Sequence, residues 1–352
     1  MKRSISIHSA LLLGLLGASW KVANTDGEQR SSIEGFTILD WQPNTLSALR
    51  FESEDRTLAL SVEALENERF YAWATLTERK EVQRPHDHDH EEESLETFPG
   101  SGESAEVEMV TEMVEETQVF KTGGSVGELL ENLAPFTAKR LIETDPSEER
   151  LEQWGLAEST RSVVLSGPGG ERRFALGGTT YKTRDRYLMD ESDRSIYLLE
   201  GTPFKKLDRS PRSLVDKSLL GAKESEISEI TVRGGDKILV LEHRNRADRQ
   251  RHKWIPQGDQ ANADSLADWI LKLIRLLATD YVQPEDVPTN LQPVLEAAVQ
   301  SDFGEVNWTL QKGTDPDGVI RWYAESSYTR AIVNVDLEQA ATLAGDFESL
   351  VD

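Results

Sequence analysis

The feature that most constrains the fold of this chain is an internal repeat. When the sequence is shifted by 181 residues, the stretch from Leu39 to Trp73 falls on the stretch from Leu220 to Trp254 without a gap. The aligned identities are Leu39 with Leu220, Ser47 with Ser228, Asp55 with Asp236, Leu58 with Leu239, Leu60 with Leu241 and Trp73 with Trp254. Similarity at a fixed offset indicates repeated structural units. We therefore expect two related modules.

Each copy predicts a β-hairpin. An alternating apolar run reaches Phe51 in the first copy and Val232 in the second, and each run leads into a polar turn. A second alternating run follows at 57–62 and at 238–241. Alternation with a period of two residues is typical of a strand with one buried face. The tryptophans that close the aligned stretches, Trp73 and Trp254, are expected at equivalent buried positions.

A helix and a β-meander are predicted after each hairpin. In module one, helical spacing of leucines follows Ser125, and β-rich runs follow at 163–165, 173–176, 187–189 and 196–199. In module two, apolar spacing predicts a helix that begins at Asp264, includes Leu277 and Tyr281, and is stopped by Pro284. Strands at 306–310, 319–324 and 332–335 and a closing helix at 337–350 complete it. The predicted class is α+β, with antiparallel sheets backed by a few helices.

These patterns divide the chain into four parts. Residues 1–23 are predicted to be a signal peptide or membrane anchor, 24–32 a tether, 33–210 module one and 211–352 module two. Module one also carries an acidic, histidine-bearing insertion at about 83–116. No lysine or arginine occurs from 85 to 120, so the first half of this insertion is expected to be disordered.

The N-terminus predicts export. Lys2 and Arg3 precede a short apolar run and the small residues at 17–19, which are the parts of a secretory signal. The alternative is an uncleaved anchor over residues 5–22. At about 1.5 Å per residue it reaches about 27 Å, which is short for a bilayer core of roughly 30 Å. Either way, we expect an exported protein that is periplasmic or anchored in the inner membrane.

Composition excludes several kinds of function. The formal net charge is −24, which argues against a nucleic-acid partner, because phosphates must be neutralised by lysine and arginine. The sequence contains no cysteine, so disulfides, thiolate metal sites and cysteine nucleophiles are excluded.

Residues 123–127 match the Gly-x-Ser-x-Gly pattern of a hydrolase nucleophile, with Ser125 at its centre. The same serine and Glu128 also form a capping box at the start of the predicted helix. An α/β-hydrolase needs alternating strands and helices, which the patterns above do not give. The helix cap is the preferred interpretation, so no catalytic residue is assigned, and a serine-directed activity probe tests the alternative.

His86, His88 and His90 alternate with aspartates ahead of three glutamates, which is a metal-binding composition. Imidazole and carboxylate ligands suit zinc, so a weakly bound zinc ion is the one cofactor considered. Consecutive residues do not converge as the i, i+4 histidines of a helical zinc site do. The competing interpretation is a solvated acidic loop.

The tip of the second hairpin is basic. It carries Arg244, Arg246, Arg249 and Arg251, with His243, His252 and Lys253 beside them, whereas the matching tip of module one is acidic. We consider two interpretations: a docking surface for an acidic partner or anionic lipid headgroups, and a solvated hairpin tip.

Several elements in a fixed order resemble a known family. Leu133-Ala134-Pro135-Phe136 is followed by Trp154-Gly155-Leu156, by Phe174-x-Leu176-Gly177 and by Ile196-Tyr197-Leu198 ahead of the second hairpin. This order resembles the bacterial family called domain of unknown function 4340. The resemblance implies an exported, often membrane-anchored protein, in some cases encoded beside ABC-transporter components of the gliding-motility type. The family has no established catalytic residues.

The sequence therefore predicts a non-catalytic extracytoplasmic accessory or scaffold protein of a bacterial envelope transport or motility complex. Its partner is expected to be an envelope protein, with an ABC-transporter component as the candidate, and the N-terminal segment is expected to contact the membrane. The alternative is a periplasmic metal- or ligand-binding protein that uses the histidine-bearing insertion.

Deleting residues 85–102 tests the predicted disorder. Such a segment buries too little apolar surface to offset the entropy cost of ordering it. We therefore expect the Tm of the deletion variant to match that of the parent in a calorimetric scan. A drop of several degrees would show that the segment packs against the fold.

Overall fold

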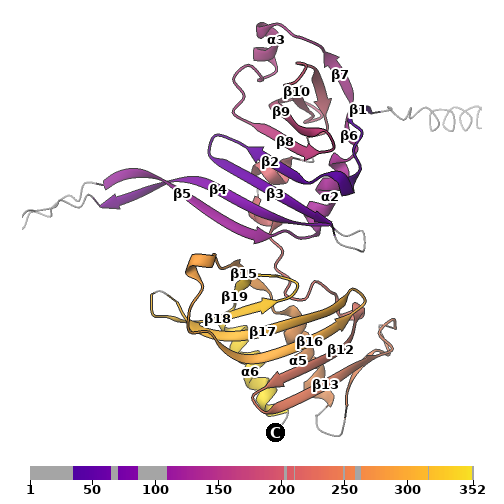
Figure 1. The fold of residues 1–352 in the computed structure, drawn as a ribbon, viewed down its shortest axis with the longest axis vertical. Helices are drawn as coiled ribbons and strands as arrows, with labels where there is room; N and C mark the ends of the chain where they lie inside the picture. The colour runs from indigo at the N-terminus through magenta and orange to yellow at the C-terminus, as the bar shows by residue number, and fades with distance from the viewer. Residues whose placement is uncertain are drawn as a thin grey trace, which may run out of the picture. The chain divides into compact units, whose positions relative to one another are not determined.

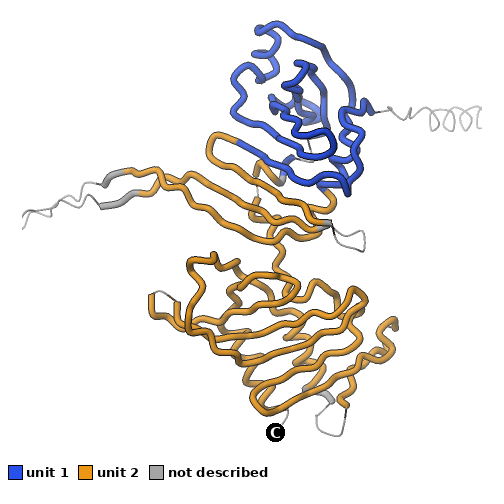
Figure 2. Tube along the Cα trace, viewed as in Figure 1, with its two compact units in different colours: residues 1–52, 129–205 blue, residues 53–128, 206–352 orange. Residues whose placement is uncertain are grey.

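The computed structural model describes residues 35–64, 70–85, 109–201, 204–209, 211–248, 250–257, 263–315 and 317–350. The chain divides into two compact units (Figure 2). Unit 1 comprises residues 1–52 and 129–205, and unit 2 comprises residues 53–128 and 206–352. The predicted signal or anchor, the tether, His86, His88, His90 and Arg249 lie outside the described residues. The predicted module boundaries stay a prediction.

Unit 1 contains an antiparallel run of strands in the order β2-β8-β9-β10-β11-β7. Their bounds are β2 Ala48–Glu52, β7 Arg140–Glu143, β8 Ser162–Gly167, β9 Gly170–Thr179, β10 Arg186–Asp190 and β11 Ile196–Leu199. A separate pair joins β1 (Phe36–Leu39) to β6 (Phe136–Ala138). The unit also contains a short 3-10 helix, η1 (Pro43–Thr45), and α3 (Glu148–Gln153). The predicted meander is present: β11 has the predicted bounds, and β8, β9 and β10 are longer than expected.

The Trp-Gly-Leu element of unit 1 ends α3 and seals a small core. Gly155 has a φ of 65°, a left-handed conformation that favours glycine after a helix. Trp154 stacks on Tyr187 with ring centroids 5.6 Å apart, and Leu156 is buried beside it. A Cβ at Gly177 would lie 2.5 Å from the Trp154 carbonyl oxygen, so that strand approaches the element as closely as glycine permits.

Unit 2 contains two sets of strands (Figure 1). The first has the order β5-β4-β3, with β3 Arg56–Ala64, β4 Phe70–Pro85 and β5 Met109–Lys121. The second is an eight-stranded antiparallel sheet in the order β14-β13-β12-β16-β17-β18-β19-β15. Its bounds are β12 Ile227–Gly234, β13 Lys237–Arg244, β14 Lys253–Pro256, β15 Ala278–Tyr281, β16 Gln292–Ser301, β17 Gly304–Thr314, β18 Ile320–Ser326 and β19 Ile332–Val335.

The helices of unit 2 are α5 (Ala263–Arg275) and α6 (Leu337–Leu350), with the 3-10 helices η2 (Pro211–Leu214), η3 (Glu224–Glu226) and η4 (Pro284–Asp286). Two further helices, α2 (Gly124–Leu133) and α4 (Lys205–Arg209), contain residues of both units. Figure 1 shows α5 and α6 on one face of the eight-stranded sheet. The described fold is mostly antiparallel β with a few helices, which confirms the α+β class.

One part of the core of unit 2 is formed where α5 and α6 pack against each other and against β12. Trp269 is 1% exposed, and its indole N–H donates to the Leu343 carbonyl over 2.9 Å. Its ring lies 5.6 Å from that of Phe347, which is also 1% exposed. Gly234 of β12 gives this ring its space, because a Cβ there would lie 2.6 Å from a Phe347 ring carbon.

Three local predictions need correction. The predicted helix from Asp264 to Pro284 ends at Arg275, because residues 278–281 instead pair with β19 as strand β15. Ser125 is the second residue of α2 rather than the residue that precedes it. Trp254 is 8% exposed, but Trp73 is only half-buried, so the expectation of equivalent burial is wrong for Trp73.

The part of the insertion that the structure describes is a long hairpin. Antiparallel pairing between β4 and β5 continues out to Pro85 with Met109. Residues 83–85 and 109–116 of the predicted insertion are therefore strand. Opposite charges support this pairing: Arg79 lies 2.9 Å from Glu115, and Lys80 contacts Glu116.

Candidate functional site

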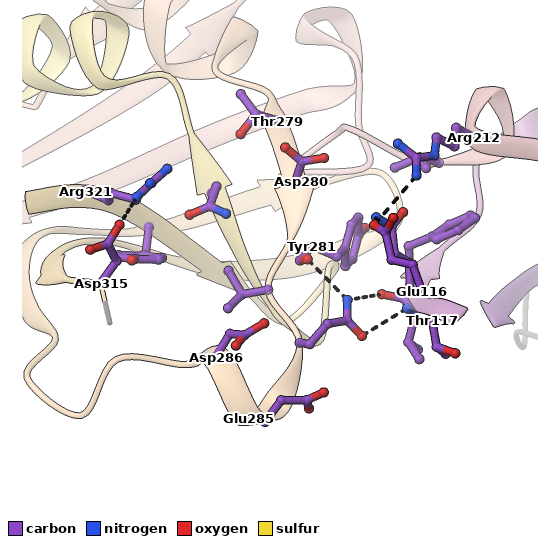
Figure 3. Close-up of a pocket in the computed structure, with 18 of the residues that line it drawn as sticks. Glu116, Thr117, Arg212, Thr279, Asp280, Tyr281, Glu285, Asp286, Asp315 and Arg321 are labelled. Carbon is purple, nitrogen blue, oxygen red and sulfur yellow. Dashed lines mark hydrogen bonds and ion pairs between the residues drawn. The ribbon is translucent and has the colours of Figure 1, made fainter. Parts of the chain in front are cut away.

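A cleft of about 760 Å³ opens in unit 2 beside the end of β5. Residues of β5, β15 and η4 line it, together with the turn between β17 and β18. Figure 3 shows Asp315 and Arg321 together on one flank, and Glu285 and Asp286 on the short helix. Clefts of this size are typical of ligand or peptide sites.

The lining of this acidic cleft is rich in carboxylates. They are Glu116, Asp280, Glu285, Asp286, Asp315 and Asp317, against the cationic Arg212, Lys217 and Arg321. Arg321 is 2.5 Å from Asp315, and Arg212 is 3.8 Å from Glu116. Within the described residues, no ion pair is recorded for Asp280, Glu285 or Asp286. The cleft therefore has a negative surplus that favours a cationic ligand.

Three of the groups that line the cleft have shifted pKa values. Hydrogen bonding from the Val319 backbone N–H, with a contribution from Arg321, lowers the pKa of Asp315. Hydrogen bonding from Lys80 lowers the pKa of Glu116. Burial, with the charge of Asp216 adding to it, raises the pKa of Tyr281. Carboxylic acids with lowered pKa values, such as Asp315 and Glu116, are poor proton donors at neutral pH.

The outer edge of β5 forms one wall of the acidic cleft. Val119 uses its backbone N–H and C=O on this outer side, where both contact the side-chain amide of Gln283 at 3.1 and 3.4 Å. The Lys121 carbonyl on the same side accepts from the Asp216 N–H over 2.8 Å. Backbone groups of alternate residues face the same way in an antiparallel strand. The groups of Met113, Glu115 and Thr117 therefore face outward as well, and β5 is the last strand in its order.

A buried lysine lies at the inner end of β5. Lys121 is 3% exposed, and its Nζ donates to the Tyr328 carbonyl over 2.7 Å. The same atom lies 3.1 Å from the centroid of the Tyr328 ring, and the Tyr328 hydroxyl donates to Asp216 over 2.5 Å. Burial lowers the pKa of Lys121 to about 8, although the nearby charge of Asp216 opposes the shift. Through these contacts the enclosed amine joins the end of β5 to the segment that contains Tyr328.

The predicted basic tip is only partly free of acidic neighbours. Arg246 lies 2.7 Å from Asp302 and donates to the Glu226 carbonyl, which holds the tip against the β16–β17 turn. Arg244 lies 3.0 Å from Glu242, and Arg251 lies 3.9 Å from Asp248. These pairs reduce the net positive field of the tip. Its docking role stays a prediction.

The sequence did not point to the acidic cleft. Its residues come from positions 116 to 334 and are brought together by pairing of β15 with β19 and by the turn at 315–321. The Asp315-Pro316-Asp317-Gly318 turn was the one local signal, since it predicts a tight turn with carboxylates at its tip.

The fold and site define an α+β protein of antiparallel sheets with an acidic cleft. Residues 122–293 match the model of the family described as Domain of unknown function (DUF4340). This match supports the family resemblance seen in the sequence. Comparison with curated proteins and with solved structures gave no significant match.

In the part of the chain that the structure describes, no helix is long and apolar enough to cross a membrane.

The buried lysine predicts a pH-dependent stability. Below pH 8 the folded state holds a charged Lys121 at a cost, because the unfolded chain, with a pKa of 10.5, binds that proton more tightly. The cost disappears as the pH rises from about 8 to 10.5. Relative to Lys121→Met, the parent should therefore gain unfolding free energy over this window, by up to about 3 kcal/mol.

Urea unfolding at a series of pH values measures this difference. Raised tyrosine pKa values lower stability above pH 10 in parent and variant alike, so the comparison isolates Lys121. Lys312→Met is the matched control, because Lys312 also lies over an aromatic ring, 4.5 Å from the Trp322 centroid, but is exposed. A parent and a Lys121→Met variant that change in parallel would contradict the prediction.

Proposed function

We propose that this chain is a non-catalytic extracytoplasmic accessory protein of a bacterial envelope complex. Its unit 2 holds an extended, positively charged segment of a protein partner in the acidic cleft. The observation that carries the proposal is the combination of two features in one place: a surplus of carboxylates and an outward-facing strand edge.

The strand edge supplies affinity that does not depend on partner side chains. A peptide that adds to a sheet edge gains backbone hydrogen bonds, and its alternate side chains then meet the neighbouring surface. The Gln283 amide already makes this kind of contact at Val119. Farther along the same edge of β5, the backbone N–H and C=O groups of Thr117 and Glu115 are the next donors and acceptors for an incoming strand.

Charge selects the kind of partner. A second copy of this chain, with net charge −24, is repelled by the carboxylates near the edge, whereas a lysine- or arginine-rich segment is attracted. Asp280 and Asp286 extend the negative field along the cleft. The proposed occupant is therefore a basic extended segment of another protein, such as a subunit of a transporter.

The non-catalytic part of the proposal is supported by the placement of the candidate reactive groups. Ser125 lies in the first turn of α2, as a helix-start residue does. Lys121 is enclosed by Tyr328 and Tyr71. The extracytoplasmic part is supported by the N-terminal sequence and by the family resemblance. Metal capture by His86, His88 and His90 stays the alternative.

We also infer that the two sheets are copies of one module. The order β2-β8-β9-β10-β11-β7 has the same chain pattern as β12-β16-β17-β18-β19-β15. Strand β3 begins at Arg56 and β13 at Lys237, which is again the 181-residue offset. Among the described residues of the second copy, no strand follows β14 as β5 follows β4, so we infer that the edge that forms the cleft is an addition to the repeated plan.

Peptide binding tests this function. A fluorescently labelled ten-residue peptide that alternates lysine and valine should bind the parent, and Asp280→Lys with Asp286→Lys should weaken binding about tenfold or more. The reversed charges repel the peptide without touching the core. Fluorescence anisotropy at physiological salt gives both dissociation constants.

A charge control and a second test variant sharpen this experiment. Glu152→Lys with Asp268→Lys makes the same change in net charge at exposed positions outside the cleft and should leave affinity nearly unchanged. Thr117→Pro removes an outward N–H that the β4 ladder does not use, which an edge strand tolerates, and should also weaken binding. Equal binding by the parent, the cleft variant and Thr117→Pro would refute the proposal.

A further inference from the structure

Three ligand-type side chains meet at the base of the β13–β14 loop. His243 is the penultimate residue of β13, His252 directly precedes β14, and Glu224 begins η3. His243 is 6% exposed, and the side chains of His252 and Glu224 are 35% and 29% exposed. Their ligand atoms all lie within 4.8 Å of one another.

The spacing suits a tetrahedral metal ion. His243 Nε2 lies 3.2 Å from His252 Nδ1, and His252 Nδ1 lies 3.9 Å from the Glu224 Oε1 atom. Around zinc, with bonds of about 2.0–2.1 Å, two tetrahedral ligand atoms are about 3.3 Å apart. The histidine pair therefore already stands at the separation that the ion requires, and Glu224 needs only a small side-chain movement.

Neighbouring groups orient two of the three ligands. The Ile227 carbonyl lies 3.0 Å from His243 Nδ1. A carbonyl only accepts, so Nδ1 carries the proton and Nε2 keeps its lone pair for a metal. The Trp254 indole N–H donates to Glu224 Oε1 over 3.2 Å, and its ring stacks on His243 with centroids 4.2 Å apart. Outer contacts of this kind are characteristic of metal sites.

We propose that Glu224, His243 and His252 bind a Zn²⁺ ion, with the fourth position left to water. Two imidazole nitrogens and one carboxylate are a donor set that zinc prefers. His252 has only to move its N–H to Nε2, so that Nδ1 can bind the metal. The partial exposure of Glu224 and His252 gives the ion a way in.

The ion fixes the loop that carries the basic tip. It joins η3 to the end of β13 and the residue before β14, in addition to the backbone pairing that already links β13 with β14. Arg246 lies within this loop and is held to Asp302. Zinc therefore holds the two ends of the arginine-bearing loop in a fixed position relative to η3. This site is separate from the histidines at 86–90 and does not depend on the acidic cleft.

Calorimetric titration with zinc chloride tests the site in the full chain. The chain has three other histidines in the insertion, so the titration is made in the His86→Ala, His88→Ala, His90→Ala background. This background should bind one zinc ion tightly. Adding either His252→Ala or Glu224→Gln should weaken zinc binding by about 100-fold or more. Loss of a residue that only orients a ligand lowers metal affinity by about 10–100-fold, and loss of the ligand itself should lower it at least as much.

Gln250→Ala is the matched control, since it changes an exposed residue of the same loop. Co²⁺ gives two further readouts. Its visible absorption reports whether the bound ion has four ligands. It should also quench the fluorescence of Trp254, and this quenching should be absent in Trp254→Phe. Circular dichroism checks that each variant is folded. Retained zinc affinity in either ligand variant, or no tight site in the background, would overturn the proposal.

Discussion

The structure of unit 2 depends on how the backbone groups at the end of β5 are satisfied. A strand at the edge of a sheet presents N–H and C=O groups that need partners. At the inner end of β5 these partners come from Gln283 and from the Asp216 backbone. Farther out, the same row of groups continues along the cleft. The proposed function depends on this difference between the inner end of β5, where the backbone groups have partners in the fold, and its outer part, where they face the cleft.

The buried lysine explains why the inner end is fixed. Its ammonium group is removed from water, and the Tyr328 carbonyl and the aromatic faces compensate for part of that cost. Asp216 binds the Tyr328 hydroxyl through its side chain and the Tyr281 hydroxyl through its backbone carbonyl. Polar contacts of this kind set the position of β5 more specifically than apolar packing would.

Local patterns predicted much of the fold. The closing helix begins at Leu337 and ends at Leu350, as expected, because its apolar spacing is uninterrupted and the chain is free to follow it. The apolar spacing through Leu277 and Tyr281 gave a wrong prediction of helix, because residues 278–281 pair with β19 and this pairing outweighs their helical preference. The length of β5 was also missed, since its many glutamates resemble a solvated loop until Arg79 and Lys80 are placed opposite them.

The sites were harder to predict than the elements. The acidic cleft and the Glu224, His243 and His252 group each combine residues that are distant in the sequence. The sequence interpretation placed His243 and His252 with the arginines of the basic tip. A sequence shows which residues carry charge, but it does not show that the ring nitrogens of these two histidines lie close together. Pairing of His243 with Trp254 across β13 and β14 supplies that missing information.

Amide hydrogen exchange along β5 tests the central claim most directly. In an isotope-labelled protein, the lysine–valine peptide should slow exchange at Met113, Glu115 and Thr117, whose N–H groups face outward. The residues between them bond to β4 already and should change little. This alternate pattern is the signature of an added strand. Unchanged exchange along β5, with protection at the basic tip instead, would contradict the account.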